Sequence, residues 1–254
     1  MDNLFNLQGK VAVITGASGG IGSVFSKELA RRGVKIVLSG RNKKKLDKLV
    51  NEIEKTGGNA VAVAGDVTKE EDAKRILKVC LDSFGTVDIL VNCAGVILRI
   101  PTEEFPVEKW EYVMDVNVKG TFLMCKIIGR EMIKRKSGKI INIGSVRGGF
   151  GCRGGYSAYC PSKGAVHLLT KTLAVEWAKY GIFVNCIAPT FIKTELTAEV
   201  LNDRHFYQEL IRDIPLGRIA MPEDLIGPLV FFASDASNFV TGQILYVDGG
   251  ITAE

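Results

Sequence analysis

The sequence is poor in the residues from which metal sites are built. Its 254 residues include only two histidines, and none of its six cysteines forms a CxxC pair. Zinc sites draw on closely spaced cysteines and histidines, so we expect no metal site, which argues against a zinc-dependent alcohol dehydrogenase. We expect the scattered cysteines to be reduced thiols packed as small apolar groups. They are Cys80, Cys93, Cys125, Cys152, Cys160 and Cys186.

Long hydrophobic runs are also absent. The longest apolar stretches, such as residues 229–233, are far too short to span a bilayer. The first ten residues, MDNLFNLQGK, carry an early acid and no basic cluster ahead of an apolar run, which is unlike a secretory signal. We therefore expect a soluble, cytoplasmic protein with no membrane partner.

The excess of positive charge is small. The formal net charge is +5, and the basic runs at residues 43–45 and 134–139 fall where we expect helices or helix ends. Such runs are usually solvated helix faces. No aromatic residues are interleaved with them, as a binder of single strands would need. We expect a small-molecule substrate and no nucleic-acid partner.

Short β-branched runs alternate with longer amphipathic segments. Several runs are continuously apolar, as expected for parallel strands covered on both faces. The alternation predicts an α/β protein with a doubly wound, parallel, seven-stranded sheet, which is a Rossmann fold in a single domain over residues 1–254. The predicted strands are 11–15, 35–39, 60–64, 88–92, 139–143, 183–187 and 244–248, and the predicted helices are 21–32, 43–56, 68–84, 110–134 and 157–180. We expect the third helix to be capped at Thr68, and the glycine-rich stretch 148–155 to be a flexible loop near a site.

A glycine-rich turn joins the first strand to the first helix. Residues 15–22 read TGASGGIG. Glycine lets the backbone turn tightly and approach a pyrophosphate, and the helix N-terminus supplies N–H groups and a positive dipole. The context favours nucleotide binding by Gly16, Ser18, Gly19, Gly20, Ile21 and Gly22 over a mere tight turn.

Other polar residues follow the strands or begin a helix. Asp66 and Val67 end the third strand, and residues 92–95, NCAG, end the fourth, where a doubly wound sheet places its ligand crevice. An ordinary strand-to-loop turn is the alternative for either segment. Tyr159 and Lys163 are four residues apart, so they share one helix face, and Pro161 suits a first helical turn. A nearby ammonium would lower the pKa of the phenol. The alternative is an exposed tyrosine and lysine on a helix face.

Two further side chains are candidates. Ser145 lies just beyond the strand 139–143, where its hydroxyl can hold a carbonyl or alcohol oxygen. Asn117 falls within a predicted helix although asparagine is a poor helix former. Holding a water molecule is one explanation for Asn117, and a surface asparagine is the other.

Taken together, these motifs resemble the classical short-chain dehydrogenase/reductase family along essentially the whole chain. TGASGGIG is similar to the family's TGxxxGxG turn, and NCAG to its NNAG, with Cys93 in place of the second asparagine. Residues 188–194, APTFIKT, resemble its PGxxxT segment, with Thr190 in place of glycine. Residues 245–250, LYVDGG, resemble the terminal strand that these enzymes use in packing tetramers, which implies a homotetramer or homodimer. The catalytic tetrad falls on Asn117, Ser145, Tyr159 and Lys163.

The resemblance implies a mechanism. Tyr159 acts as general acid in reduction and general base in oxidation, while the nicotinamide moves the hydride. Lys163 lowers the pKa of Tyr159 and binds the nicotinamide ribose, Ser145 positions the substrate oxygen, and Asn117 holds a proton-relay water. The implied cofactor-binding residues are Gly16, Ser18, Gly19, Gly20, Ile21, Gly22, Arg41, Asp66, Val67, Asn92, Ala94, Tyr159, Lys163, Ile192 and Thr194.

The substrate is less well defined by the sequence. Residues 102–106, 214–218 and 222–225 are similar to gluconate 5-dehydrogenases and related sugar-acid or polyol dehydrogenases. Arg147, with Tyr159 and Ser145, is a candidate for substrate binding, and Arg99 and Arg153 lie in neighbouring loops. A 3-oxoacyl-thioester reductase, a broad ketone reductase and an inactive nucleotide-binding sensor remain alternatives, as do simply solvent-exposed arginines.

The expected cofactor is NADP(H) in preference to NAD(H). Discrimination rests on the end of the second strand, which here reads Ser-Gly-Arg-Asn at 39–42. The resemblance places the acid of NAD-specific members at Gly40, and Arg41 can pair with a 2′-phosphate. Many NADP-using relatives carry a second basic residue where this chain has Gly19, so dual use is the alternative.

Overall fold

The computed structural model describes residues 4–194, 197–198, 202 and 204–253. Seven strands form one parallel sheet in the order β3-β2-β1-β4-β5-β6-β7, which confirms the predicted fold. The central strand β1 pairs Ala12 with Ile36 on one side and with Ile89 on the other. The strands are β1 (Val11–Thr15), β2 (Lys35–Gly40), β3 (Asn59–Ala64), β4 (Ile89–Asn92), β5 (Gly138–Ile143), β6 (Ile182–Pro189) and β7 (Ile244–Val247).

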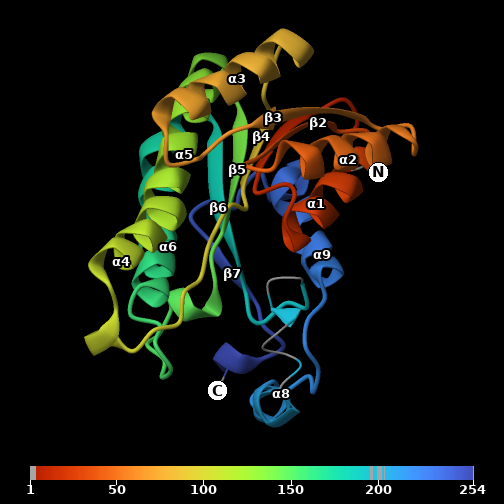
Figure 1. Cartoon of the computed structure of the whole chain (residues 1–254). Coiled ribbons are helices and arrows are strands. Elements are labelled where there is room, and N and C mark those ends of the chain that lie inside the picture. The colour runs from red at the N-terminus through yellow and green to blue at the C-terminus, as the bar shows by residue number, and fades with distance from the viewer. Residues whose placement is uncertain (1–3, 195–196, 199–201, 203, 254) are drawn as a thin grey trace.

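Helices cover both faces of this sheet. Figure 1 shows α1 (Gly20–Arg31), α2 (Lys43–Glu54) and α9 (Ile226–Ala233) together on one face. On the other face lie α3 (Glu70–Phe84), α5 (Gly120–Arg135) and α6 (Tyr159–Trp177). The two cores follow from the strand pleat, in which successive side chains point to opposite faces. Ile14 of β1 therefore packs with the first group of helices and Val13 with the second.

The strand order reverses beside β1, and this positions the site. The chain runs outward from β1 to β2 and β3, then returns to β4 on the other flank of β1. At the carboxyl ends, Thr15 Oγ1 of β1 accepts hydrogen bonds from the backbone N–H groups of Cys93 (3.1 Å) and Ala94 (3.2 Å). In open α/β sheets, ligands bind at this reversal point.

Two predicted helices differ in the structure. The segment 110–134 is divided into α4 (Val107–Met114), a π-helical turn (Asp115–Lys119) and α5. Helix α3 begins at Glu70, so the predicted cap at Thr68 is wrong. Thr68 instead donates hydrogen bonds from its N–H and its hydroxyl to Asp66 Oδ1, at 3.0 and 2.8 Å, which holds it in the loop that precedes the helix.

Helices α8 (Arg204–Arg212) and α9 were not predicted. Helix α9 is apolar around most of its circumference, because it is buried between the sheet and α1, and so it lacks the stripe that reveals an amphipathic helix. Helix α8 stands apart from the two main layers, near the carboxyl end of the sheet (Figure 1). Leu210 of α8 packs in a small separate cluster with Ile214 and Ile219.

No helix in the described part of the chain has both the length and the apolar character needed to cross a membrane. Among the same residues, no group of three or more His, Cys, Asp or Glu side chains is placed to hold a metal ion.

Candidate active site

The glycine turn after β1 packs too closely for side chains. Gly16 has a φ of +63°, and a Cβ there would lie 2.8 Å from the backbone Cα and N of Ala94. A Cβ on Gly22 would lie 2.3 Å from the carbonyl oxygen of Gly16, and one on Gly20 would lie 2.6 Å from Thr194 Cβ. Gly19 precedes α1 without a side-chain cap, so the N–H groups of the first turn are left for a ligand.

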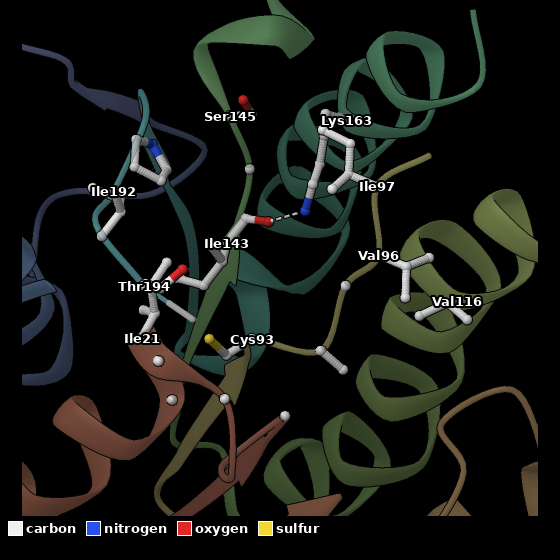
Figure 2. Close-up of a pocket in the computed structure, with 18 of the residues that line it drawn as sticks. Ile21, Cys93, Val96, Ile97, Val116, Ile143, Ser145, Lys163, Ile192 and Thr194 are labelled. Atoms are coloured by element: carbon white, nitrogen blue, oxygen red, sulfur yellow. Dashed lines mark hydrogen bonds between the residues drawn. The ribbon is translucent and has the colours of Figure 1, made fainter. Parts of the chain in front are cut away.

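A cavity of about 410 Å³ opens at this turn and extends to the start of α6. Figure 2 shows Ile21, Cys93, Ser145, Lys163 and Thr194 arranged around it. Most of the predicted site residues line this one space. They are Gly16, Ser18, Gly19, Gly20, Ile21, Gly22, Arg41, Asp66, Val67, Ala94, Ser145, Arg147, Tyr159, Lys163, Ile192 and Thr194.

Asn92 does not line the cavity, although we expected it to bind cofactor. Its side chain is buried in the sheet, where Nδ2 donates to Asn142 Oδ1 of β5 at 2.9 Å and to Cys125 Sγ at 3.2 Å. Asn92 therefore ties β4 to β5 and α5. The next residue, Cys93, does line the cavity, and burial raises the pKa of its thiol to about 12, so the thiol stays protonated at neutral pH.

Asn117 lies in the π-helical turn between α4 and α5 and is buried, which excludes the surface alternative. Its Oδ1 accepts from Val96 N at 2.8 Å, and its Nδ2 donates to Val96 O and to Ser162 Oγ, both at 2.9 Å. Single π-helical turns are frequent at functional sites. The π-helical turn orients the Asn117 amide toward both Val96 and Ser162. Val96 belongs to the segment after β4 that lines the cavity, and Ser162 belongs to α6, so the amide holds this segment against α6.

Tyr159, Lys163 and Ser145 converge on the cavity. Helix α6 begins at Tyr159, as its proline two residues later favours, and both Tyr159 and Lys163 line the space, which confirms their shared face. Tyr159 makes a side-chain hydrogen bond with Ser145, which follows β5. Lys163 is buried, and its Nζ donates to the carbonyl oxygen of Ile143 at 2.8 Å, as Figure 2 shows.

The predicted lowering of the pKa of Tyr159 by Lys163 is wrong for this structure. Burial raises the pKa of Tyr159 to about 12, and the hydrogen bond with Ser145 offsets only part of that rise. Lys163 Nζ lies 5.8 Å from the centre of the phenol ring and is turned to Ile143. Burial also lowers the pKa of Lys163 itself. The phenol is therefore protonated at neutral pH, the form of an acid that donates.

Of the three arginines predicted near the substrate, Arg99, Arg147 and Arg153, only Arg147 lines the cavity. Its guanidinium lies 5.4 Å from the ring centre of Tyr156, and that of Arg99 lies 5.1 Å from the same ring. Arg99 and Arg153 are exposed and outside the lining. Sequence reasoning missed Tyr156, which is buried and lines the cavity. The available signal was an aromatic residue three positions before Tyr159, in a glycine-rich loop that also carries an arginine.

At the other end of the cavity, Arg41 follows β2. Its side chain is exposed, and Nη1 donates to the Tyr112 hydroxyl of α4 at 3.0 Å. A Cβ on Gly40 would lie 3.3 Å from Ser18 Oγ, so an acidic side chain at Gly40 would intrude beside Ser18. Of the neighbouring lysines, Lys43 is paired with Asp47.

A dinucleotide cofactor fits these residues. The close approaches at Gly16, Gly20 and Gly22 leave backbone, not side chains, facing the cavity at the start of α1. Arg41 stands at the end of β2, where a ribose or its phosphate would be read. Tyr159 and Lys163 lie at the far end of the same cavity.

Comparison with known proteins gives a consistent pattern. A family model described as enoyl-(acyl carrier protein) reductase matches residues 16–252. Gluconate 5-dehydrogenase from Gluconobacter oxydans is 41% identical over 250 residues, which cover 98% of this chain and 97% of that protein. The crystal structure of a gluconate 5-dehydrogenase from Burkholderia cenocepacia, in complex with NADP and tartrate, matches with a TM-score of 0.95 and 38% identity, covering 99% and 98% of the two chains. A short-chain type dehydrogenase/reductase from Mycobacterium marinum matches with a TM-score of 0.94 and 37% identity, covering 99% of each chain.

Proposed function

The chain belongs to the short-chain dehydrogenase/reductase family and is an NAD(P)-dependent oxidoreductase acting on CH–OH groups, and from that premise we propose that it interconverts the alcohol and ketone forms of a sugar acid, as a gluconate 5-dehydrogenase does. A polyol is the nearest variant of this substrate. The proposal is supported by the relatives named for sugar acids and by one feature of this chain's own cavity.

That feature is Arg147, and it carries the proposal. The guanidinium is held against the ring of Tyr156 in the wall of the cavity that also holds Ser145 and Tyr159. Its Nε is buried and has no hydrogen-bond partner among the described residues. A buried donor without a partner is costly unless a ligand satisfies it, and a guanidinium matches a carboxylate in charge and geometry. We assign Arg147 to the substrate carboxylate.

The catalytic roles follow from the positions of the side chains. When bound, the nicotinamide supplies or accepts the hydride. In reduction, the protonated Tyr159 hydroxyl donates its proton to the ketone oxygen, and in oxidation it takes the alcohol proton back. Ser145, hydrogen-bonded with Tyr159, holds the same substrate oxygen. Lys163 contributes a buried positive charge next to Tyr159 and binds the ribose. The family resemblance assigns the relay water to Asn117, whose amide is hydrogen-bonded to Val96 and Ser162.

We propose NADP(H) as the preferred cofactor and NAD(H) as the poorer one. Gly40 leaves room at the end of β2, and Arg41 lines the cavity there. The bond from Arg41 to the Tyr112 hydroxyl is exposed, so a phosphate can compete for the guanidinium. The relative from Burkholderia cenocepacia was solved with NADP, which agrees with this choice.

We further propose that the enzyme is a homotetramer or homodimer. Large apolar side chains are exposed on the outer helices, including Phe122 of α5 and Leu168 and Val175 of α6. Leu245 and Tyr246 are also exposed, on the edge strand β7. Such patches are typical of interfaces. Light scattering after size exclusion distinguishes the assemblies from a monomer.

The second candidate is reduction of a 3-oxoacyl thioester. It is favoured by the description of the matching family model, which names an acyl carrier protein substrate. Val96, Ile97 and Val116 also give one side of the cavity an apolar wall. One observation counts against a thioester substrate. An apolar acyl chain would leave the buried donor of Arg147 without a partner, whereas the carboxylate of a sugar acid would satisfy it.

The deciding experiment compares kcat/KM for 5-ketogluconate, an acetoacetyl thioester and a neutral ketone with NADPH. We expect 5-ketogluconate to be preferred. Arg147→Ala should raise its KM about 10- to 100-fold, as the loss of a charged hydrogen bond implies, and leave KM for the neutral ketone nearly unchanged. Arg153→Ala, which removes an exposed arginine outside the cavity, is the matched control. Better turnover of neutral substrates, together with an unchanged KM in Arg147→Ala, would contradict the proposal. If none of the three compounds were turned over, the protein would be a nucleotide sensor.

A further inference from the structure

Two of the six cysteines lie side by side next to the active site. The Sγ atoms of Cys152 and Cys160 are 3.2 Å apart and in hydrogen-bond contact, and both residues are partly exposed. Cys80, Cys125 and Cys186 are buried, as expected for thiols packed as apolar groups. The same expectation does not account for two accessible thiols in contact.

The pair joins two segments that carry site residues. Cys160 follows Tyr159 directly, in the first turn of α6. Cys152 lies in the glycine-rich loop after the 3-10 helix Val146–Gly148, which carries Arg147. A covalent bond between the two sulfurs would therefore tie the loop that follows the proposed substrate arginine to the helix that carries the proposed proton donor.

We propose that Cys152 and Cys160 are a redox-responsive dithiol, which a hydroperoxide converts into an intramolecular disulfide that slows turnover reversibly. In the first step Cys152 Sγ attacks one peroxide oxygen and the O–O bond breaks, giving a sulfenic acid and releasing the other oxygen as water or an alcohol. Cys160 Sγ then attacks that sulfur, the S–S bond forms, and the sulfenic oxygen leaves as water. Two electrons pass to the peroxide, and both thiol protons leave in the products.

The order of the steps follows from the surroundings of Cys160. Burial and the adjoining Cys152 thiol raise the pKa of Cys160 to about 12, while the positive charge of Arg147 acts in the opposite direction. Cys160 therefore keeps its proton at neutral pH, and it gives up this proton as it attacks the sulfenic sulfur in the second step. The thiolate is the form that attacks a peroxide, and the raised pKa of Cys160 disfavours its thiolate, so we assign the first step to Cys152.

The loop can absorb the closure. A disulfide bond is about 2.05 Å long, so the sulfurs must approach by roughly 1 Å. Cys160 is held in α6, and the glycine-rich side must move. A Cβ built on Gly151 would meet no atom within 4 Å, and Gly154 and Gly155 already have φ values of +94° and +80°. Glycines stand on both sides of Cys152, and the open space at Gly151 lets the preceding part of the loop move at low cost.

The chemical test uses a cleavage site between the two cysteines. Trypsin cuts after Arg147, Arg153 and Lys163, which places Cys152 in the peptide GGFGCR and Cys160 in GGYSAYCPSK. The full-length protein is treated with hydrogen peroxide, its free thiols are blocked, and it is digested without reductant. We expect the two peptides to appear as one linked species, which dithiothreitol separates. This readout does not depend on the proposed substrate.

The functional test follows turnover on the same samples. We expect activity to fall about tenfold or more with the time course of linkage, since moving the loop next to Arg147 misplaces the substrate, and a misplacement of about 1 Å can cost a hundredfold. We expect dithiothreitol to restore the activity. Each of Cys152→Ser and Cys160→Ser, compared with its own untreated activity, should lose both the linkage and the response. Cys80→Ala, which removes a thiol buried between α3 and the sheet, should keep both.

Three results would overturn the proposal. The first is the absence of the linked peptide at peroxide doses that inactivate the enzyme. The second is a linked peptide with unchanged turnover. The third is the same inactivation in Cys152→Ser, which would move the sensitivity to another thiol, such as Cys93 in the cavity wall.

Discussion

His167 should make the stability of this enzyme depend on pH in a predictable way. It lies one turn after Lys163 on α6 and is 7% exposed. It packs against Gly144 and Gly148, where an added Cβ would lie 2.5 Å from His167 Nε2 and 2.6 Å from Cε1, respectively. Nε2 has no hydrogen-bond partner among the described residues. Burial, with smaller effects from the charges of Lys163 and Lys171, lowers the pKa of His167 to about 4.

The direction and size of the effect follow from this pKa. An unfolded histidine titrates near pH 6.5, so between about pH 6.5 and 4 the unfolded chain binds a proton that the folded chain refuses. The free energy of unfolding therefore falls as the pH drops through this window. With the folded pKa at about 4, the loss between pH 7 and pH 5 amounts to about 2 kcal/mol, from about 1.4 kcal/mol per pKa unit. Carboxylates add their own dependence, so a variant must isolate the histidine.

The assay is urea unfolding at pH 7 and pH 5 for the wild type, His167→Gln and His205→Gln. The chain has only these two histidines, and His205 is exposed on α8, which makes it a matched control. We expect the wild type and His205→Gln to lose about 2 kcal/mol more than His167→Gln does over this interval. An equal loss in all three proteins would show that His167 is not held neutral by the fold, and would refute the reasoning.

The remaining predictions concern single contacts in the site. Asn117→Ala should lower the free energy of unfolding by about 3 kcal/mol or more, because it leaves both backbone groups of Val96 without their partner; a urea midpoint close to that of the wild type would contradict this. Gly16→Ala should weaken NADP binding at least about tenfold, measured by titration calorimetry, because its Cβ would lie 2.8 Å from the Ala94 backbone at a φ of +63°; unchanged affinity would mean that the turn does not approach the cofactor. Arg41→Ala should lower kcat/KM for NADPH about tenfold and leave that for NADH nearly unchanged, as the loss of one charge-assisted bond implies. A wild-type preference for NADH, or an unaltered preference in the variant, would remove the assignment to NADP(H).

The strands were predictable because their burial leaves a direct trace. Each of the seven runs of β-branched and apolar residues became a strand of the sheet, with bounds that shift by only a few residues. The Tyr159–Lys163 pair was predictable for a similar reason, since spacing along a helix fixes which side chains share a face.

Other features depend on contacts that the sequence does not display. Asn92 belongs to the NCAG motif, yet its side chain turns into the sheet, because Asn142 of the neighbouring strand supplies a partner fifty residues away. The π-helical turn at Asn117 reflects a hydrogen bond to Val96, which lies on a distant segment. The raised pKa of Tyr159 depends on how deeply α6 is packed, which spacing does not reveal. Helix α9 gave no periodic signal because both of its sides are covered.

The central claim is that Tyr159 transfers the proton in turnover, and Tyr159→Phe tests it most directly, because it removes the hydroxyl alone. Tyr180→Phe, at the far end of the segment that begins with α6, is the control. We expect Tyr159→Phe to fold, to bind NADP as the wild type does, and to lose about 100- to 10,000-fold in kcat, the contribution typical of a positioned acid–base group. A Tyr159→Phe enzyme that binds NADP and keeps more than about a tenth of the wild-type kcat would contradict the account.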